Sequence, residues 1–285
     1  MRRQELSADQ VKQQAKEAAH EASPWIERLG RLGYIAKGVV YILVGVLAAE
    51  AAVGAGGKTT DTRGALQEIL QARFGKVLLL AITVGLVGYA LWRFAQAGLD
   101  ADRKGSDAKG RLIRTSYAMI GAIYAGLALT ALRLALGSGD RSSTDAKTQG
   151  WTAWLLGKPL GPWLVGLAGL VVIGVGINQL VQAYTAPFRQ NLKTGTLGYE
   201  RAKWVTHVGR LGFIARGVVF GIVGVFLIVA AIRVQPGEAR GLGGALETLA
   251  QQPFGPWLLG IVSLGLIAYG LFMLILARYR HMIVT

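Results

Sequence analysis

The chain has 285 residues, 52% of them hydrophobic, and carries a formal net charge of +15. Its mean hydropathy of +0.41 is high for a soluble domain. The sequence contains no cysteine, which excludes disulfides, thiolate nucleophiles and cysteine metal ligands.

Residues 1–24 are charged throughout and lack the continuous apolar core of a cleavable signal peptide. Ser7 is placed to cap a helix that runs to about Glu21, and Ser23 and Pro24 are placed to cap and begin the next helix. We expect this segment to be a solvated or amphipathic helix on the cytoplasmic membrane face.

Apolar runs dominate the rest of the chain. A helix needs about 20 residues to cross a hydrocarbon core about 30 Å thick. Lipid offers no hydrogen-bond partner to the backbone, so each crossing segment must be helical. The sequence therefore predicts an all-α integral membrane protein with six spans, at residues 34–53, 77–97, 112–136, 160–184, 213–232 and 257–277.

One pattern occurs three times along the chain. The segment GRLGYIAKGVVY at residues 30–41 returns as GRLGFIARGVVF at residues 209–220, and a weaker copy begins at Arg114. The second half of the first unit also returns in the third at an offset of 180 residues, as in GALQE at 64–68 and GALET at 244–248. Each unit therefore contains two spans.

The predicted organisation is the leading segment 1–24 followed by three two-span repeats at residues 25–106, 107–200 and 201–285. An even number of spans per unit makes the repeats parallel, related by an axis along the membrane normal. We expect a pseudo-threefold bundle of three hairpins, packed closely through some of its 40 glycines.

The repeated motif Arg-Leu-Gly-aromatic-x-Ala-basic-Gly-x-x-aromatic, on paired spans, resembles the bacterial membrane family catalogued as domain of unknown function 1206. The resemblance covers residues 25–279. The first and third copies fit the motif, whereas the middle copy has Ser116 in place of a glycine and Ile120 in place of the basic residue. The resemblance implies a six-span membrane protein and transfers no catalytic residues.

The basic residues are concentrated beside the span ends on the side that carries both termini. The positive-inside rule therefore predicts a multi-pass protein of the bacterial inner membrane with both termini in the cytoplasm. Since these charges do not lie on one compact domain, we expect anionic lipid headgroups of the cytoplasmic face as partners, and no nucleic acid.

Aromatic and basic residues share one helical face at the start of each repeat. Two interpretations are open: three such faces line a vestibule whose cations select anions, or the cations snorkel to cytoplasmic headgroups while the aromatic rings pack. The second is favoured because Ile120 interrupts the ring of charge. The candidate positions are Tyr34, Lys37 and Tyr41, then Tyr117 and Tyr124, then Phe213, Arg216 and Phe220.

Further polar candidates lie inside predicted spans. Glu50 lies near the outer end of the first span, where it is either a cation or proton site or, as its depth favours, an interface-facing carboxyl. Asn178, Gln179 and Gln182 lie in the cytoplasmic half of the fourth span and either hydrogen-bond between helices or contact a substrate.

The sequence offers no catalytic pattern. It has no His-Glu-x-x-His zinc motif, no Gly-x-Ser-x-Gly elbow and no phosphate-binding glycine loop, so no catalytic, metal or cofactor residues are predicted. We expect a non-catalytic structural or interaction protein whose three aromatic–glycine faces pack together at the centre. The alternative is a small channel or transporter for an ion or small solute along the pseudo-threefold axis.

Overall fold

The computed structural model describes residues 8–100, 105, 107–138, 144–186 and 199–279, and it describes side chains from residue 28 and, in the last range, from residue 202. Within these residues the chain is helical and contains no strand. Six helices are long and apolar enough to cross a membrane, which confirms the all-α integral membrane class. They are the Arg28–Ala52 part of α1 (Ala8–Ala52), α3 (Gly75–Leu99), α4 (Ala108–Ala135), α6 (Gly161–Thr185), the Ala202–Arg233 part of α8 (Tyr199–Arg233) and α10 (Gly255–Tyr279).

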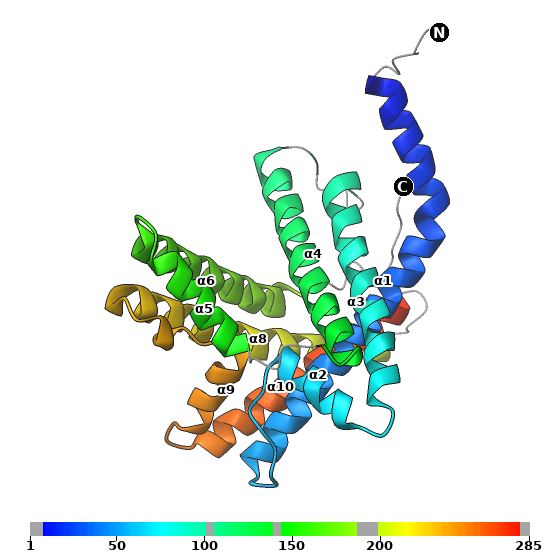
Figure 1. Cartoon of the computed structure of the whole chain (residues 1–285). Coiled ribbons are helices and arrows are strands. Elements are labelled where there is room, and N and C mark those ends of the chain that lie inside the picture. Colours follow the sequence, from blue (N-terminus) through cyan, green and yellow to red (C-terminus); the bar gives the residue numbers. More distant parts are fainter. Residues whose placement is uncertain (1–7, 101–104, 106, 139–143, 187–198, 280–285) are drawn as a thin grey trace.

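The first helix differs from expectation. The break predicted at Ser23 and Pro24 is wrong, because α1 is one continuous helix from Ala8 to Ala52, and Figure 1 shows it projecting beyond the other helices. Pro24 removes only one backbone donor, and the alanine- and glutamate-rich residues before it favour helix. Ser7, the predicted cap, lies outside the described residues.

Short helices join the two spans of each repeat. They are α2 (Thr62–Gln71), α5 (Thr144–Leu156), the 3₁₀ turn η2 (Pro236–Glu238) and α9 (Leu242–Ala250). Asp61 begins α2, since its Oδ1 accepts from the backbone N–H of Arg63 and of Gly64, both at 2.8 Å. This capping satisfies donors that have no partner inside the helix.

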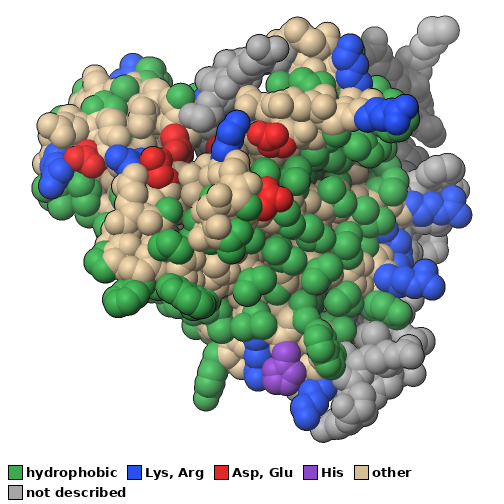
Figure 2. Space-filling model, turned by 90° about the horizontal axis from the view of Figure 1, so that it is seen from below, with side chains coloured by type: hydrophobic (Ala, Val, Ile, Leu, Met, Phe, Trp, Pro, Cys, Tyr) green, Lys and Arg blue, Asp and Glu red, His purple; other side chains and the backbone are tan. Residues whose placement is uncertain are grey.

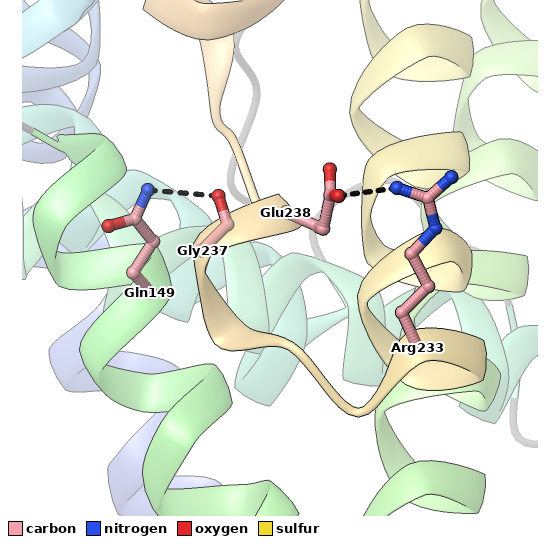
Figure 3. Close-up of polar contacts among 4 residues, drawn as sticks. All are labelled: Gln149, Arg233, Gly237 and Glu238. Atoms are coloured by element: carbon pink, nitrogen blue, oxygen red, sulfur yellow. Dashed lines mark hydrogen bonds and ion pairs between the residues drawn. The ribbon is translucent and has the colours of Figure 1, made fainter.

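The connections of the three repeats meet on one side of the bundle, which we call the connector side. Asp145 of α5 accepts at 2.6 Å from the backbone N–H of Gly241, just before α9. Figure 3 shows two more links: Gln149 Nε2 donates to Gly237 O at 3.3 Å, and Arg233 Nη1 bonds Glu238 Oε1 at 2.6 Å. The opposite side, where α3, α6 and α10 end, we call the terminal side.

Each first span packs against the second span of another repeat. The most extensive contacts join α1 to α10, α4 to α3 and α8 to α6. Within repeats, α1 packs on α3 and α8 on α10, but α4 and α6 share no comparable contact among the described residues. Figure 1 shows α6 following α8 away from α4. The parallel, pseudo-threefold arrangement therefore stays a prediction, with the middle hairpin open.

Equivalent glycines lie at these three interfaces. A Cβ added to Gly38 of α1 would lie 2.8 Å from Gly270 O of α10, and one added to Gly217 of α8 would lie 3.1 Å from Gly176 O of α6. A Cβ at Gly121 of α4 would lie 3.0 Å from a ring carbon of α3. Small residues allow this close approach between membrane helices, as the sequence predicted.

The arginine that opens each repeat motif caps another helix. Arg31 Nη1 donates to two carbonyls at the end of α10, at 2.7 and 2.9 Å. Arg114 donates to two at the end of α3, at 2.7 and 2.9 Å, and Arg210 Nη2 to one at the end of α6, at 3.2 Å. The last carbonyls of a helix lack intrahelical partners, so these arginines satisfy them and fix the register between repeats.

Two hydrophobic clusters fill the interior. The connector-side half is packed by aliphatic residues of α1, α2, α3, α4, α8, α9 and α10, including Val44, Leu86 and Leu266. The terminal-side half is mainly aromatic and includes Tyr34, Tyr89 and Phe272. On the surface, Figure 2 shows a broad hydrophobic region between two charged margins, with the visible acidic side chains along one of them. That distribution fits a membrane-embedded belt.

Candidate functional site

Three basic side chains meet inside the terminal-side half: Lys37 of α1, Arg93 of α3 and Arg216 of α8. We call them the cationic cluster. Lys37 is 6% exposed, although it lies in the middle of an apolar helix. Its ammonium lies 5.0 Å from the ring centroid of Tyr89, and 5.1 and 5.4 Å from those of Tyr124 and Tyr269. Three tyrosine rings therefore surround one buried cation.

Arg93 shares a hydroxyl with Lys37. Its Nε and Nη2 donate to Tyr89 Oη at 3.0 and 2.6 Å, and Lys37 Nζ donates to the same oxygen at 3.3 Å. Arg93 Nη1 also donates to Gln96 Oε1 at 3.0 Å, and its guanidinium carbon lies 5.2 Å from the ring centroid of Tyr117. One phenol oxygen thus accepts from two cations.

Arg216 is held by a second tyrosine. Its Nη1 donates to Tyr269 Oη at 2.6 Å, and its guanidinium carbon lies 4.3 Å from the centroid of that ring. In the amide orientation that satisfies both groups, Gln179 Oε1 accepts from Arg216 Nη1 at 3.0 Å and from Nη2 at 3.3 Å. Arg216 Nε is buried and has no hydrogen-bond partner within the described residues.

Shared rings show how close the charges are. Tyr269 lies 5.4 Å from the Lys37 ammonium and 4.3 Å from the Arg216 guanidinium, so those two charges are less than 10 Å apart. Tyr89 lies 5.0 Å from both Lys37 and Arg93, so that pair is at most 10 Å apart.

None of the three cations forms an ion pair with a carboxylate in the part of the chain that the structure describes. Burying unpaired charge is costly, and like charges at this separation repel. Tyrosine rings and hydroxyls lower that cost. Within the described residues, these three cations therefore have aromatic and hydroxyl partners but no carboxylate counter-charge.

The structure brings most of the predicted site residues together. Tyr34 meets Tyr89 edge-on, with centroids 5.3 Å apart, and Phe213 meets Tyr269 in the same way at 5.8 Å. Tyr41 packs on Tyr269 at 4.9 Å. Tyr124 packs on Tyr89 at 4.6 Å, and Phe220 lies 5.2 Å from the Arg216 guanidinium.

Two expectations about this region need correction. Lys37 and Arg216 do not reach outward to headgroups, since both lie against interior tyrosines at 5.4 and 4.3 Å from the same ring. The aromatic–glycine faces do not pack on one another as whole faces, because Gly38 and Gly45 of α1 lie against α10. The aromatic residues turn inward, and the glycines serve the neighbouring interface.

The sequence analysis missed the second spans. Tyr89 and Arg93 lie on α3 and Tyr269 lies on α10, and none of the three is among the predicted site positions. A single arginine inside the apolar run 77–97 was the available signal. The substitution at Ile120 does not remove the third charge, because Arg93 supplies it from α3, the helix on which α4 packs.

The remaining candidates lie apart from the cluster or at its edge. Glu50 is exposed in the last turn of α1 on the connector side, and Asn178 is exposed on α6. Of Glu50, Asn178 and Gln179, only Gln179 is buried, and it contacts Arg216. Among the described residues, no group of three His, Asp or Glu side chains is arranged to hold a metal ion.

These observations define a polytopic α-helical membrane protein built from internal repeats. The model of the family described as Domain of Unknown Function (DUF1206) matches the chain three times, over residues 32–100, 115–186 and 211–280, and the chain belongs to this family. This confirms the resemblance inferred from the repeated motif. The chain is also 39% identical over 262 residues to "Uncharacterized protein YxxB" of Bacillus subtilis (strain 168), covering 92% of this chain and 94% of that protein. No solved structure matches it.

Proposed function

We propose that this is a non-catalytic protein of the bacterial inner membrane, with both termini in the cytoplasm, that binds an oxyanion at the cationic cluster. One observation carries the proposal: the buried Lys37 shares a tyrosine ring with each of the half-buried Arg93 and Arg216, so its charge lies within about 10 Å of both, and no carboxylate is paired to any of the three in the described part of the chain. Guanidinium groups present planar, paired donors that match carboxylate, sulfate and phosphate oxygens.

The proposed orientation rests on charge. Positively charged connections remain on the cytoplasmic side of bacterial membranes, and the terminal side is the richer in Lys and Arg. In this orientation the cluster lies in the cytoplasmic half of the bundle. The surrounding surface arginines and lysines would then face anionic lipid headgroups, which are the proposed lipid partners.

The packing favours binding over conduction. Beyond the cluster, the connector-side half is filled by aliphatic side chains such as Val44 and Leu266, each 1% exposed or less. A charged solute passing along the axis would have to displace this core. Binding within a packed bundle therefore agrees with a structural or interaction role, in which the anion joins helices of different repeats.

A channel or transporter is the second candidate, and the open middle repeat favours it. Tyr124 of α4 and Gln179 of α6 both reach the cluster, yet the two helices do not pack extensively on each other. A change in the α4–α6 separation would alter access to the cations.

Isothermal titration of the detergent-solubilised protein with sulfate, phosphate and acetate tests the proposal. The expected result is saturable binding of about one oxyanion per chain, weakened at least tenfold in Arg216→Gln. Arg278→Gln, which removes a charge at the end of α10, is the matched control. Absence of saturable binding for all three anions would overturn the proposal. Release of trapped radiolabelled sulfate from proteoliposomes, abolished by Arg216→Gln, would favour the transporter instead.

A further inference from the structure

A charged recess lies on the connector side, away from the cationic cluster. It has a volume of about 410 Å³ and lies between α2, α5, α6 and α8. Two cations, Arg63 and Lys147, share its wall with Trp151 and Trp154. Val165 and Leu227 contribute to the apolar remainder. The recess therefore combines positive charge with a largely hydrophobic lining.

The Arg63 side chain lines this recess. Its backbone N–H is bonded to the Asp61 cap, whereas its side-chain Nη1 is buried and has no hydrogen-bond partner among the described residues. A buried charged donor without an acceptor is unfavourable, so the guanidinium is prepared for an external acceptor. An anionic oxygen is the partner that suits it best.

The tryptophans indicate the depth of the recess. Trp151 and Trp154 meet edge-on with ring centroids 5.9 Å apart, and Lys158 Nζ lies 5.0 Å from the Trp154 ring. Both indoles are more than half exposed, and they precede the first turn of α6. Tryptophan and lysine at the start of a membrane helix are typical of the headgroup region.

The helix that lines the recess also carries exposed apolar residues. Val165 of α6, which lines the recess, is itself buried, and Leu164, Leu167 and Val171 of the same helix are exposed. A polar anion would gain little from this apolar track, whereas an amphiphile would use both parts. The α5 wall is held in place by Asp145, which accepts from the backbone N–H of Gly241. It is also held by Gln149, which donates to Gly237 O (Figure 3).

We propose that this recess binds the headgroup of an anionic membrane phospholipid. A phosphodiester oxygen accepts from the Arg63 guanidinium, Lys147 adds positive charge, and an acyl chain lies along the exposed apolar side chains of α6. The proposal is independent of the cationic cluster, because none of the recess residues touches Lys37, Arg93 or Arg216.

Native mass spectrometry of the full-length protein, titrated with phosphatidylglycerol, tests this inference. Arg63→Gln is expected to weaken phosphatidylglycerol binding at least tenfold. Arg73→Gln, an exposed arginine between α2 and α3 outside the recess, is expected to bind as the unmodified protein does. If Arg63→Gln does not fold, Leu227→Trp fills the recess without removing a charge and is expected to weaken binding similarly.

Two results would overturn the inference. Equal phosphatidylglycerol binding by Arg63→Gln and Arg73→Gln would show that Arg63 holds no headgroup. Displacement of the Arg63-dependent lipid by inorganic phosphate at equal concentration would show a site for the free anion. Retention of the lipid under that competition supports the phospholipid assignment. Because Lys37→Met leaves the recess intact, it should bind phosphatidylglycerol normally even if the oxyanion site fails its own test.

Discussion

Replacing Lys37 by methionine removes one charge from the cationic cluster while keeping a long, flexible, apolar side chain among the same tyrosines. Lys37 Nζ and Arg93 Nη2 bond the same Tyr89 oxygen at 3.3 and 2.6 Å, so they are at most about 5.9 Å apart, and Lys37 lies within about 10 Å of Arg216. At these separations and an effective dielectric constant of about 20, the two pairs of charges repel by about 2.8 and 1.7 kcal/mol. The substitution therefore relieves about 4.5 kcal/mol of repulsion.

The substitution also removes favourable contacts. Lys37 lies over three rings, and each cation–π contact contributes about 0.5–1 kcal/mol, or about 2 when desolvated. The three lost contacts total about 1.5–6 kcal/mol, a range that includes the relieved repulsion, so stability without an oxyanion should change by less than about 3 kcal/mol. With sulfate the outcome differs, because an oxyanion at about 100 times its Kd stabilises the unmodified protein by about 2.7 kcal/mol.

The assay is thermal unfolding in detergent, followed by tryptophan fluorescence with and without sulfate. Lys37→Met loses one charge-assisted contact of about 1.5–3 kcal/mol, so its Kd should rise about 10- to 100-fold. At the same sulfate concentration its stabilisation should fall from about 2.7 to about 0.4–1.4 kcal/mol. Sulfate also stabilises proteins by general exclusion, so Lys58→Met, on an exposed lysine, is the control. Equal sulfate responses in Lys37→Met and Lys58→Met would refute the reasoning.

Two further predictions concern the bundle itself. Gly38→Ala should lower the unfolding free energy by about 1–3 kcal/mol, because its Cβ would lie 2.8 Å from a backbone carbonyl of α10. Gly126→Ala, where a Cβ meets nothing within 4 Å, should leave stability unchanged or raise it, and a reversed order would contradict the packing. Arg31→Met should lower the unfolding free energy by about 1 kcal/mol, because it removes the side chain that caps α10. Thermal unfolding compared with the control Lys109→Met measures this loss, and equal unfolding midpoints for the two variants would exclude a capping role for Arg31.

The sequence predicted the membrane class, six spans and three repeats because these depend on length, composition and self-similarity. The glycine interfaces were also predictable, since equivalent positions such as Gly38 and Gly217 recur in the motif. The packing of α8 on α6 could not be predicted, because a repeat unit suggests that its own two helices pack together. The structure instead exchanges partners between repeats and leaves α4 and α6 apart.

The site was predicted in part. The sequence marked Lys37 and Arg216 as cations in apolar helices. Whether their side chains point outward or into the bundle depends on the neighbouring helix, which is α3 for Lys37 and α10 for Arg216. An isolated helix near a membrane boundary favours snorkelling, whereas Tyr89 and Tyr269 offer hydroxyls at 3.3 and 2.6 Å in the interior. Pairwise spacing along one helix contains no information on such contacts. The continuous α1 was missed for a similar reason, since local capping at Ser23 competed with strong helix propensity on both sides.

A crystal structure of the protein grown with selenate, with anomalous diffraction collected at the selenium edge, tests the central claim most directly. The account predicts an anomalous peak among Lys37, Arg93 and Arg216, in contact with at least two of these side chains, and no such peak in Arg216→Gln. Selenate peaks confined to surface arginines, with the tyrosine-lined cluster unoccupied, would contradict the proposal that these cations exist to bind an oxyanion.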